Sequence, residues 1–422
     1  MPTRSILLPY GDETLTVNVP ARNMLAVLSP RETPTCADAR AEIRRALATP
    51  IGTAHLVDAA RGSKRVVIAA DDLTRQTPVD IIIPVLLDEL NRAGARDEQV
   101  TVLIALGTHR YMTPAEIMAH FGAEVVGRVQ VINNPWQDPA QLVDLGTTPN
   151  GTPVRVSRIA LEADFLIGLG SIVPHHIPGY SAGAKIIQPG VCGAVTTGAT
   201  HYLSTRAPRS YLGTVENPVR AELEHIAGLV GLKCILNTVL DHTGRLVEAF
   251  YGDFVQAHRA GVRRAAKVYG AHAPGTADIV IAGSHPCDIE FWQAHKSLYP
   301  AEICVKPGGS ILVVAPCPEG VSVMHHDMLQ YTAMSSERID GLIQSGAISD
   351  VVSAAVALAW AKVREHAPVS LVSGGIPRED ALALGFTPFD SVEDALNAAM
   401  RRHGPDATIS VLTHAPEILP LM

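Results

Sequence analysis

Short apolar runs that alternate with longer, alanine-rich stretches are the feature that most limits the fold of this 422-residue chain. The runs have the length of buried strands, and the stretches between them have the pattern of helices. This alternation predicts βαβ units, in which helices join and cover parallel strands. The predicted strands are 65–70, 99–106, 129–133, 164–170, 234–240, 278–283, 310–315, 368–373 and 408–412, and the predicted helices include 78–93, 114–121, 254–269 and 391–403.

The length of the chain exceeds what one ordinary hydrophobic core supports, which favours two domains. Residues 271–276, Ala-His-Ala-Pro-Gly-Thr, have the composition of a linker and lie between a predicted helix and a predicted strand. We therefore predict an α/β protein with mostly parallel sheets, divided into residues 1–272 and 273–422, with the active-site crevice between the two domains. The alternating residues 1–20 predict a hairpin that turns at Tyr10-Gly11-Asp12.

Charge and cysteine usage exclude several classes of protein. The net charge is −8 and no dense block of Lys and Arg occurs, which argues against nucleic acid and anionic membranes as partners. The chain also shows no signal-peptide pattern and no apolar run of transmembrane length. No C-x-x-C pair occurs among the six cysteines, so we expect reduced thiols and a cytoplasmic protein; they are Cys36, Cys192, Cys234, Cys287, Cys304 and Cys317.

Polar residues follow several predicted strands at the point where each strand ends. In open α/β sheets, ligands bind beyond the carboxyl ends of the strands. We therefore expect these polar segments to face a common crevice. They are Asp71-Asp72, Thr108-His109, 171–175 and Ser284-His285.

Residues 174–190, Pro-His-His-Ile-Pro-Gly-Tyr-Ser-Ala-Gly-Ala-Lys-Ile-Ile-Gln-Pro-Gly, concentrate reactive side chains in a glycine-rich turn. The turn is a near miss to a P-loop, because Lys185 is displaced by one residue and is followed by Ile186. Its backbone can still approach a phosphate, and the lysine supplies a charge or a nucleophile. The preceding 168–170 has two glycines of a dinucleotide fingerprint but lacks the third, which argues against a Rossmann site.

Most of the 17 histidines are expected to be packed or solvated, and His225, His242, His258, His366 and His403 are interpreted in that way. His109, His175 and His201 differ, because they follow strands or lie near the glycine-rich turn, where loops expose side chains to a crevice.

Two further segments have an ordinary interpretation and a functional one. Residues 71–78 are either a helix N-cap with a surface arginine or a clamp in which Arg75 grips an anion. Gln293 and Lys296 share one face of a predicted helix, which by itself is typical of a solvated surface.

Taken together, these motifs resemble the nickel-pincer lactate racemase family, which includes other 2-hydroxyacid racemases and epimerases. The resemblance extends from position 10 to position 360, and its central motif is specific. The matching residues are 10–12, Asp72-Leu73-Thr74-Arg75, 107–109, 174–175, 179–181, Lys185, 189–190, His201, Gln293, Lys296 and Trp360. Ala182 and Ala184 stand where the motif often has glycine.

The resemblance implies a nickel-bearing pyridinium-3,5-bisthiocarboxylic acid mononucleotide that cofactor-maturation enzymes supply. It implies that Lys185 tethers this cofactor, that His201 binds the nickel, and that His109 and His175 are the acid/base residues. By the same resemblance Arg75, Gln293, Lys296 and Trp360 bind the substrate. Residues 1–272 would form the cofactor-binding and catalytic domain, and residues 273–422 would complete the substrate site. Asp72, Leu73, Thr74 and Arg75 would line the cofactor or substrate.

The residue types suit this chemistry on independent grounds. The Cα–H of a 2-hydroxy acid is too weakly acidic for an imidazole to remove, so a hydride acceptor is needed, and each enantiomer then needs its own base. We therefore expect a racemase or epimerase of a lactate-like or malate-like 2-hydroxy acid, a small-molecule partner. Two alternatives remain: a metal-dependent hydrolase that uses the same histidines without an organic cofactor, and a non-catalytic protein that binds a carboxylated or phosphorylated metabolite.

Overall fold

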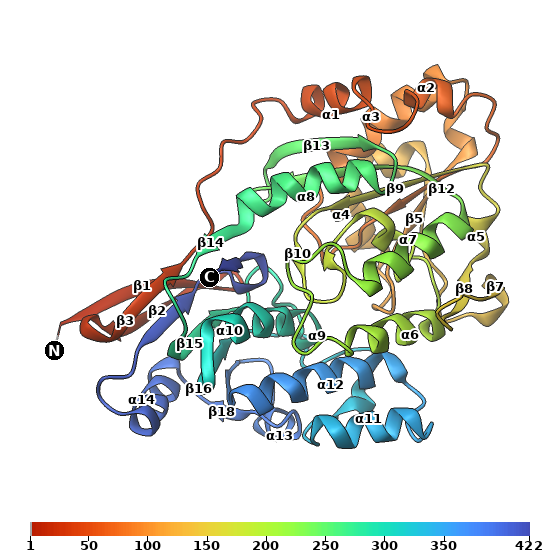
Figure 1. The fold of residues 1–422 in the computed structure, drawn as a ribbon. Coiled ribbons are helices and arrows are strands. Elements are labelled where there is room, and N and C mark those ends of the chain that lie inside the picture. Colours follow the sequence, from red (N-terminus) through yellow and green to blue (C-terminus); the bar gives the residue numbers. More distant parts are fainter. Residues whose placement is uncertain (1) are drawn as a thin grey trace.

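Two six-stranded sheets form the centre of the molecule, seen in a computed structural model that describes residues 2–422 (Figure 1). In the first sheet all neighbouring strands are parallel except β12 and β13, which are antiparallel. From edge to edge its strands are β13 (Leu246–Gly252), β12 (Leu232–Leu240), β9 (Phe165–Ser171), β4 (Val66–Ala70), β5 (Val100–Ile104) and β6 (Gln130–Asn133).

The second sheet is parallel throughout. Its strands are, in order, β18 (Thr387–Phe389), β17 (Val369–Val372), β16 (Val305–Val314), β15 (Ala277–Gly283), β19 (Ile409–Leu412) and β3 (Met24–Leu28). Smaller two-stranded pairs are β1 (Thr3–Tyr10) with β2 (Glu13–Pro20), β7 (Leu142–Thr147) with β8 (Pro153–Ser157), β10 (Pro174–His175) with β11 (Gly179–Tyr180), and β14 (Gly270–His272) with β20 (Leu419–Leu421).

Helices pack on both faces of the first sheet. One face is covered by α1 (Ala39–Ala48), α2 (Leu56–Ala59), α3 (Val79–Arg92) and α4 (Pro114–Arg128), and the other by α5 (Arg158–Leu161), α7 (Pro218–Val230) and the 3-10 turn η4 (Gly183–Ile186), while α8 (Gln256–Tyr269) packs on β12 and β13. None of the helices within residues 2–422 combines the length and the apolar character that a membrane crossing requires.

The second sheet has helices on one face and a mixed layer on the other. Its first face carries α9 (Phe291–Ala294), η5 (His295–Ser297), α10 (Leu298–Cys304), α11 (Ser336–Gln344), α12 (Val351–His366) and α13 (Arg378–Ala383), and the other carries α14 (Val392–His403) and the β1–β2 hairpin. The helix α6 (Ala194–Ser204) packs against α12 and so joins the two halves of the molecule (Figure 1).

The nine strands predicted from the sequence are all present, and the predicted α/β class is confirmed. They were recognisable because strands covered on both faces are continuous apolar runs, as in β4, where every residue is buried. Three strands of the two large sheets, β3, β13 and β18, were missed, and each of them lies at the edge of its sheet.

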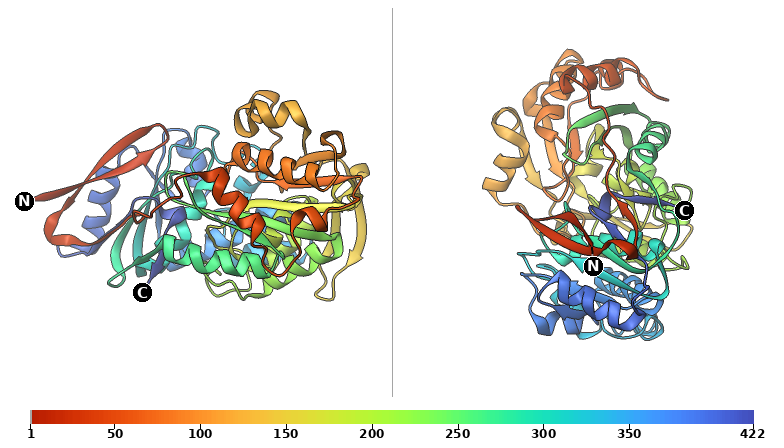
Figure 2. Two further views of the ribbon diagram at one scale, coloured as in Figure 1. Left: turned by 90° about the horizontal axis from the view of Figure 1, so that it is seen from above. Right: turned by 90° about the vertical axis from the view of Figure 1, so that its left-hand side faces the viewer.

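The beginning of the chain belongs with the second sheet. The predicted hairpin is present, with β1 and β2 paired from Thr3 to Pro20, and β3 then pairs with β19. After β3 the chain crosses to α1, which packs on the first sheet (Figure 2). The predicted division, which placed all of residues 1–272 in one domain, is corrected at this point, because the pairing of β3 adds residues 3–28 to the second unit.

The hairpin provides a test of this packing, because Leu7 and Leu8 are adjacent and face opposite sides. The Leu8 side chain is fully buried against the second sheet, whereas Leu7 is 64% exposed. We expect Leu8→Ala to lower the free energy of unfolding by about 2–5 kcal/mol through the cavity it leaves, and Leu7→Ala to change it by less than about 0.5 kcal/mol. Urea unfolding followed by circular dichroism measures both. Equal effects would mean that the hairpin does not pack as described.

Candidate active site

A cavity of about 810 Å³, including its open mouth, lies between the two units at the carboxyl ends of β4, β5 and β9. The predicted crevice between two domains is therefore present. Side chains from both units line it, and eight of the predicted site residues are among them: Asp72, Arg75, His109, His175, Lys185, His201, Gln293 and Lys296. The wall of the cavity also includes Asp71, His176, Trp292 and His295.

Three predicted site residues lie elsewhere. Leu73 and Thr74 line an adjoining cavity, which shares a wall with the first. Trp360 is completely buried in α12, where its ring packs edge-on against Phe291 at 5.1 Å and lies 5.2 Å from the ring of His295. Trp360 therefore supports the residues of the wall and does not line the cavity itself.

The polar segment Ser284-His285 also departs from expectation. Ser284 is buried and its hydroxyl donates to the carbonyl of Val314, while His285 lines the adjoining cavity. The other polar strand ends reach the main cavity, although Ser171 lines the adjoining one.

A chain of hydrogen bonds connects four of the predicted residues across the two units. The Nδ1 atom of His109 donates to Asp72 Oδ2 at 2.6 Å, and the amide nitrogen of Gln293 donates to His109 Nε2 at 3.0 Å. The carbonyl oxygen of Gln293 accepts from Lys296 Nζ at 2.5 Å and from Arg75 Nη1 at 3.4 Å. This direction of donation leaves the lone pair of His109 on Nε2, which faces the second unit.

Asp72 is the group that orients His109. Burial alone would raise the pKa of Asp72, but the contact with His109 outweighs it and holds that pKa well below its usual value. Asp72 Oδ1 also accepts from the backbone and the hydroxyl of Thr74, at 3.1 and 2.5 Å, which forms a tight turn after β4. Arg75 Nη1 in turn donates to Thr74 Oγ1 at 2.7 Å, so the turn holds the guanidinium at the cavity.

His175 has the opposite hydrogen-bonding arrangement. Its Nδ1 accepts from the backbone N–H of Ile177 at 3.2 Å, so the neutral ring carries its hydrogen on Nε2. The ring stacks on His176 at 4.6 Å, and His176 stacks on Tyr299 at 4.0 Å. Burial, with the nearby Lys185 charge, holds the pKa of His175 well below its usual value.

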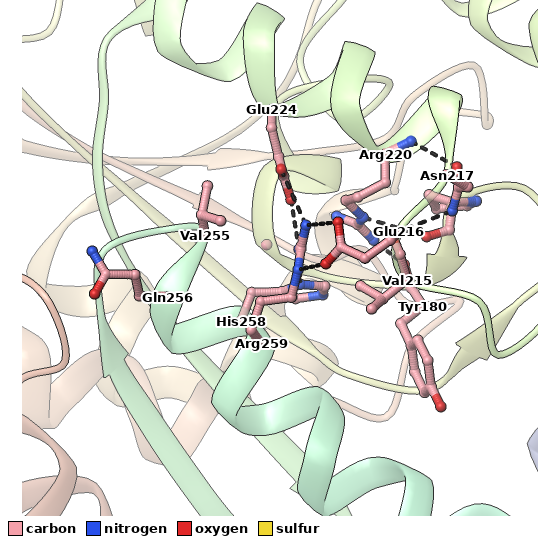
Figure 3. Close-up of polar contacts among 12 residues, drawn as sticks. Tyr180, Val215, Glu216, Asn217, Arg220, Glu224, Val255, Gln256, His258 and Arg259 are labelled. Carbon is pink, nitrogen blue, oxygen red and sulfur yellow. Dashed lines mark hydrogen bonds and ion pairs between the residues drawn. The ribbon is translucent and has the colours of Figure 1, made fainter.

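The loop between His175 and Lys185 is held by Arg220 of α7 (Figure 3). The buried guanidinium donates to the carbonyls of Pro178 at 3.3 Å and Ala182 at 3.1 Å, and also to that of Tyr180. Burial lowers its pKa to about 9. Three carbonyls from one short segment converge on a single side chain, which determines the path of the loop.

Residues of α8 and β12 hold the other side of this loop. His258 Nε2 donates to the carbonyl of Ser181 at 2.9 Å, and the Asn237 side-chain oxygen accepts from Gly183 N–H at 2.9 Å. Gly183 has a φ of +58°, and a Cβ there would lie 2.8 Å from the His258 ring. Ala182 also has a φ of +58°, a conformation that favours glycine, which accounts for the glycine common at this position of the motif. The interpretation of His258 as a packed histidine is confirmed.

The glycines at 168 and 170 allow close packing against β9. A Cβ on Gly168 would lie 2.6 Å from the Ile186 side chain, and one on Gly170 would lie 2.9 Å from Asp71 Oδ2. The missing Cβ atoms therefore let η4 and Asp71 approach β9.

Lys185 is suited to react with an electrophile, and His201 is suited to bind a metal. Burial, with the charges of Arg75 and Lys296, lowers the pKa of Lys185 to about 7, which makes part of the amine nucleophilic at neutral pH. Burial, with the charge of Lys185, lowers the pKa of His201 to about 3 and so keeps its imidazole neutral. The Nδ1 atoms of His201 and His176 are buried without a hydrogen-bond partner within residues 2–422.

A second histidine–carboxylate pair lies beside the site and was not found from the sequence. His325 Nδ1 contacts Asp350 Oδ2 at 2.6 Å, its Nε2 lies 3.3 Å from the hydroxyl of Thr108, and its ring stacks on Trp292 at 4.2 Å. This pair joins the loop after β5 to the second unit. Nothing in the local sequence connects these positions, and the same holds for Arg220 and Asn237.

Comparison with known proteins gives the family. The family model described as the lactate racemase N-terminal domain matches residues 10–213, and that described as the lactate racemase C-terminal domain matches residues 273–418. The chain belongs to the lactate racemase family. Members of this family are isomerases, and this chain is a racemase-type enzyme of that family.

Relatives and solved structures agree with the family assignment. The chain is 33% identical to a lactate racemase of Thermoanaerobacterium thermosaccharolyticum over 322 residues, 75% of each chain, and 28% identical to one of Lactiplantibacillus plantarum over 417 residues, 97% of each. The structure of the lactate racemase apoprotein of T. thermosaccharolyticum superposes with a TM-score of 0.89 at 28% identity, covering 99% of this chain and 100% of that one. A Thermotoga maritima protein, 19% identical, shares the fold with a TM-score of 0.73 over 91% and 98% of the two chains.

The charge of Lys185 provides a test of the site electrostatics. Since this ammonium lowers the pKa of His175, the variant Lys185→Met, which has similar length and no charge, should raise that pKa toward its ordinary value. Burial still acts, so the pKa should remain below that of a solvated histidine. NMR titration of the imidazole measures the shift. Lys233→Met, which removes an exposed lysine, should leave the His175 pKa unchanged, and an unchanged value in Lys185→Met would contradict the description of the site.

Proposed function

We propose that this enzyme racemises or epimerises a 2-hydroxy acid with a nickel-pincer nucleotide that is tethered to Lys185 and bound through nickel to His201. The single observation that carries the proposal is that one cavity contains the oriented His109, the neutral His175, a nucleophilic lysine and a neutral histidine with an unpartnered nitrogen. The names of the relatives support lactate as one candidate substrate.

The residues present fit the cofactor. The lowered pKa of Lys185 suits a covalent bond to an acyl group, and the neutral imidazole of His201 suits nickel, which accepts nitrogen and sulfur ligands. When bound, the nucleotide would supply the group that takes a hydride from the substrate Cα and returns it. Cofactor-maturation enzymes are then the protein partners that this chain requires.

The residues of the cavity would perform the binding and the proton transfer. Arg75 and Lys296 carry positive charge on one side of the cavity and would hold the carboxylate of the substrate. Gln293 would then exchange its hydrogen bond to His109 for one to the substrate. His109, oriented by Asp72, would accept the hydroxyl proton of one enantiomer at Nε2. His175 would be the acid/base residue for the other enantiomer, and it would donate to the ketone oxygen from its imidazolium form, with that proton taken up from solvent. In the opposite direction the two histidines exchange these tasks.

The two alternatives are less well supported. A catalytic zinc site of the usual kind has three protein ligands, and no group of three or more His, Cys, Asp or Glu side chains in residues 2–422 is arranged to hold a metal. A metal on His201 would therefore need ligands from a second molecule, as the pincer nucleotide provides. A non-catalytic binding protein would have no need of the Asp72–His109 pair, whose geometry is that of an oriented base.

The first prediction on function concerns the two attachment points. Protein produced together with the maturation enzymes should carry added mass and nickel, and Lys185→Ala should carry no added mass. His201→Ala should lose nickel and keep the added mass, because the two attachments are chemically separate. Intact mass spectrometry and metal analysis give the readouts, with protein made without the maturation enzymes as the folded, empty control. Added mass in Lys185→Ala, or full nickel in His201→Ala, would contradict the assignment.

The second prediction concerns the two bases. His109→Ala and His175→Ala should each abolish steady-state racemisation, since every turnover uses both histidines. In a single turnover, each variant should still react with one enantiomer, and the reactive enantiomer should differ between the variants. The slow enantiomer should lose about a hundredfold to ten-thousandfold in rate. Rapid mixing with pure enantiomers, followed by cofactor absorbance, measures this, and equal reactivity of both variants with both enantiomers would exclude the two-base scheme.

A further inference from the structure

A second cavity, of about 1080 Å³ including its open mouth, adjoins the site and shares part of its wall. The shared residues are those that would bind and position the substrate: Arg75, His175, Gln293 and Lys296. A 2-hydroxy acid whose carboxylate lies at Arg75 and Lys296 therefore has its Cα at the boundary between the two cavities. Its side chain can then extend into the second cavity.

The walls of the second cavity are mainly apolar. They include Leu73, Val173, Leu240, Tyr269, Pro286 and Ile289. The hydroxyl of Tyr269 donates to the carbonyl of Leu240 at 2.9 Å, so its hydrogen-bonding capacity is used within the protein. A cavity of this kind gains binding free energy from apolar atoms that displace water, and a single methyl group would leave most of it unfilled.

One carboxyl group interrupts the apolar wall. Glu417 belongs to the turn η7 (Ala415–Glu417), which packs against β10 and η5, the segments that carry His175 and Lys296. The residue is only 7% exposed and lines the cavity, and its Oε2 has no hydrogen-bond partner within residues 2–422. His285, on the same wall, already pairs with Asp288 at 3.3 Å.

This carboxyl determines which polar groups the cavity accepts. A buried oxygen without a partner gains from a hydrogen-bond donor, such as a hydroxyl. A second carboxylate on the ligand would instead face the carboxylate of Glu417. Burial raises the pKa of Glu417 to about 7, so the group is partly protonated at neutral pH and fully repulsive only above it.

On the basis of the proposed function, we propose that the second cavity binds the side chain of the substrate, and that this side chain is extended, mainly apolar and free of a second carboxylate. The substrate class is a long-chain alkyl or aryl 2-hydroxy acid. A terminal hydroxyl, as on a hydroxyphenyl group, is the polar group that suits Glu417. Lactate and dicarboxylic 2-hydroxy acids fit this cavity less well.

The test measures binding of racemic acids to the cofactor-loaded enzyme by calorimetry, because a racemate undergoes no net reaction. The ligands are lactate, 2-hydroxyhexanoate, 3-(4-hydroxyphenyl)lactate and 2-hydroxyglutarate. We expect 2-hydroxyhexanoate and 3-(4-hydroxyphenyl)lactate to bind at least tenfold more tightly than lactate. At pH 8, 2-hydroxyglutarate should bind no more tightly than lactate. The proposal would be overturned if lactate or 2-hydroxyglutarate bound as tightly as 2-hydroxyhexanoate and 3-(4-hydroxyphenyl)lactate, or more tightly.

Two variants connect the preference to this cavity. Ile289→Trp fills it and should reduce the preference for the long acids over lactate at least tenfold, whereas Val195→Trp, which places the same side chain in a separate cavity of about 960 Å³, should leave the preference unchanged. Glu417→Gln keeps the size and removes the charge, so it should tighten binding of 2-hydroxyglutarate at pH 8. An unchanged preference in Ile289→Trp would overturn the proposal even if the wild-type protein prefers long acids.

Chiral chromatography of pure enantiomers separates the two levels of the proposal. If the binding preference is found and no acid is interconverted, the proposed racemisation is wrong and the cavity remains a side-chain site. If lactate is interconverted and bound as tightly as the long acids, the racemase function holds and the side-chain proposal is wrong.

Discussion

The buried Arg220 guanidinium is the group on which the geometry of the site depends. Removing such a cation from water is costly unless its donors are satisfied, and here the carbonyls of Pro178, Tyr180 and Ala182 satisfy them. Because these carbonyls belong to one short loop, the loop must curl around the guanidinium. His175 at one end of the loop and Lys185 at the other are thereby brought to the same cavity.

The position of Arg220 depends in turn on contacts between α7 and α8. Arg259 of α8 donates to Glu216 at 2.7 Å and to Glu224 of α7 at 2.6 Å, and Asn217 caps the start of α7 (Figure 3). His258, the neighbour of Arg259, holds the loop from its other side. The ion pairs on the surface and the buried loop are therefore parts of one connected arrangement.

The cavity itself has an excess of positive charge. Arg75, Lys185 and Lys296 line it together with Asp71 and Asp72, and Asp72 is engaged by His109. Burial and the charge of Arg75 lower the pKa of Lys185 to about 7 and that of Lys296 to about 8, so more of Lys185 than of Lys296 is unprotonated at neutral pH. Such a site suits anionic ligands such as a carboxylate and the phosphate of a nucleotide. Both units are needed to form the cavity, because Gln293 and Lys296 come from the second unit.

Local sequence determined the α/β class, the nine strands and the residues of the central motif, because buried strands and glycine-rich turns leave continuous signals along the chain. His109, His175, Lys185 and His201 were predicted and lie in one cavity. Only the tertiary structure decided that β3 joins the second sheet, that Trp360 packs behind the wall, and that Arg220, His325 and Glu417 lie at the site or beside it. Those roles arise from contacts between residues far apart in the chain, and the local pattern of apolar and polar residues contains no information on which distant segments meet.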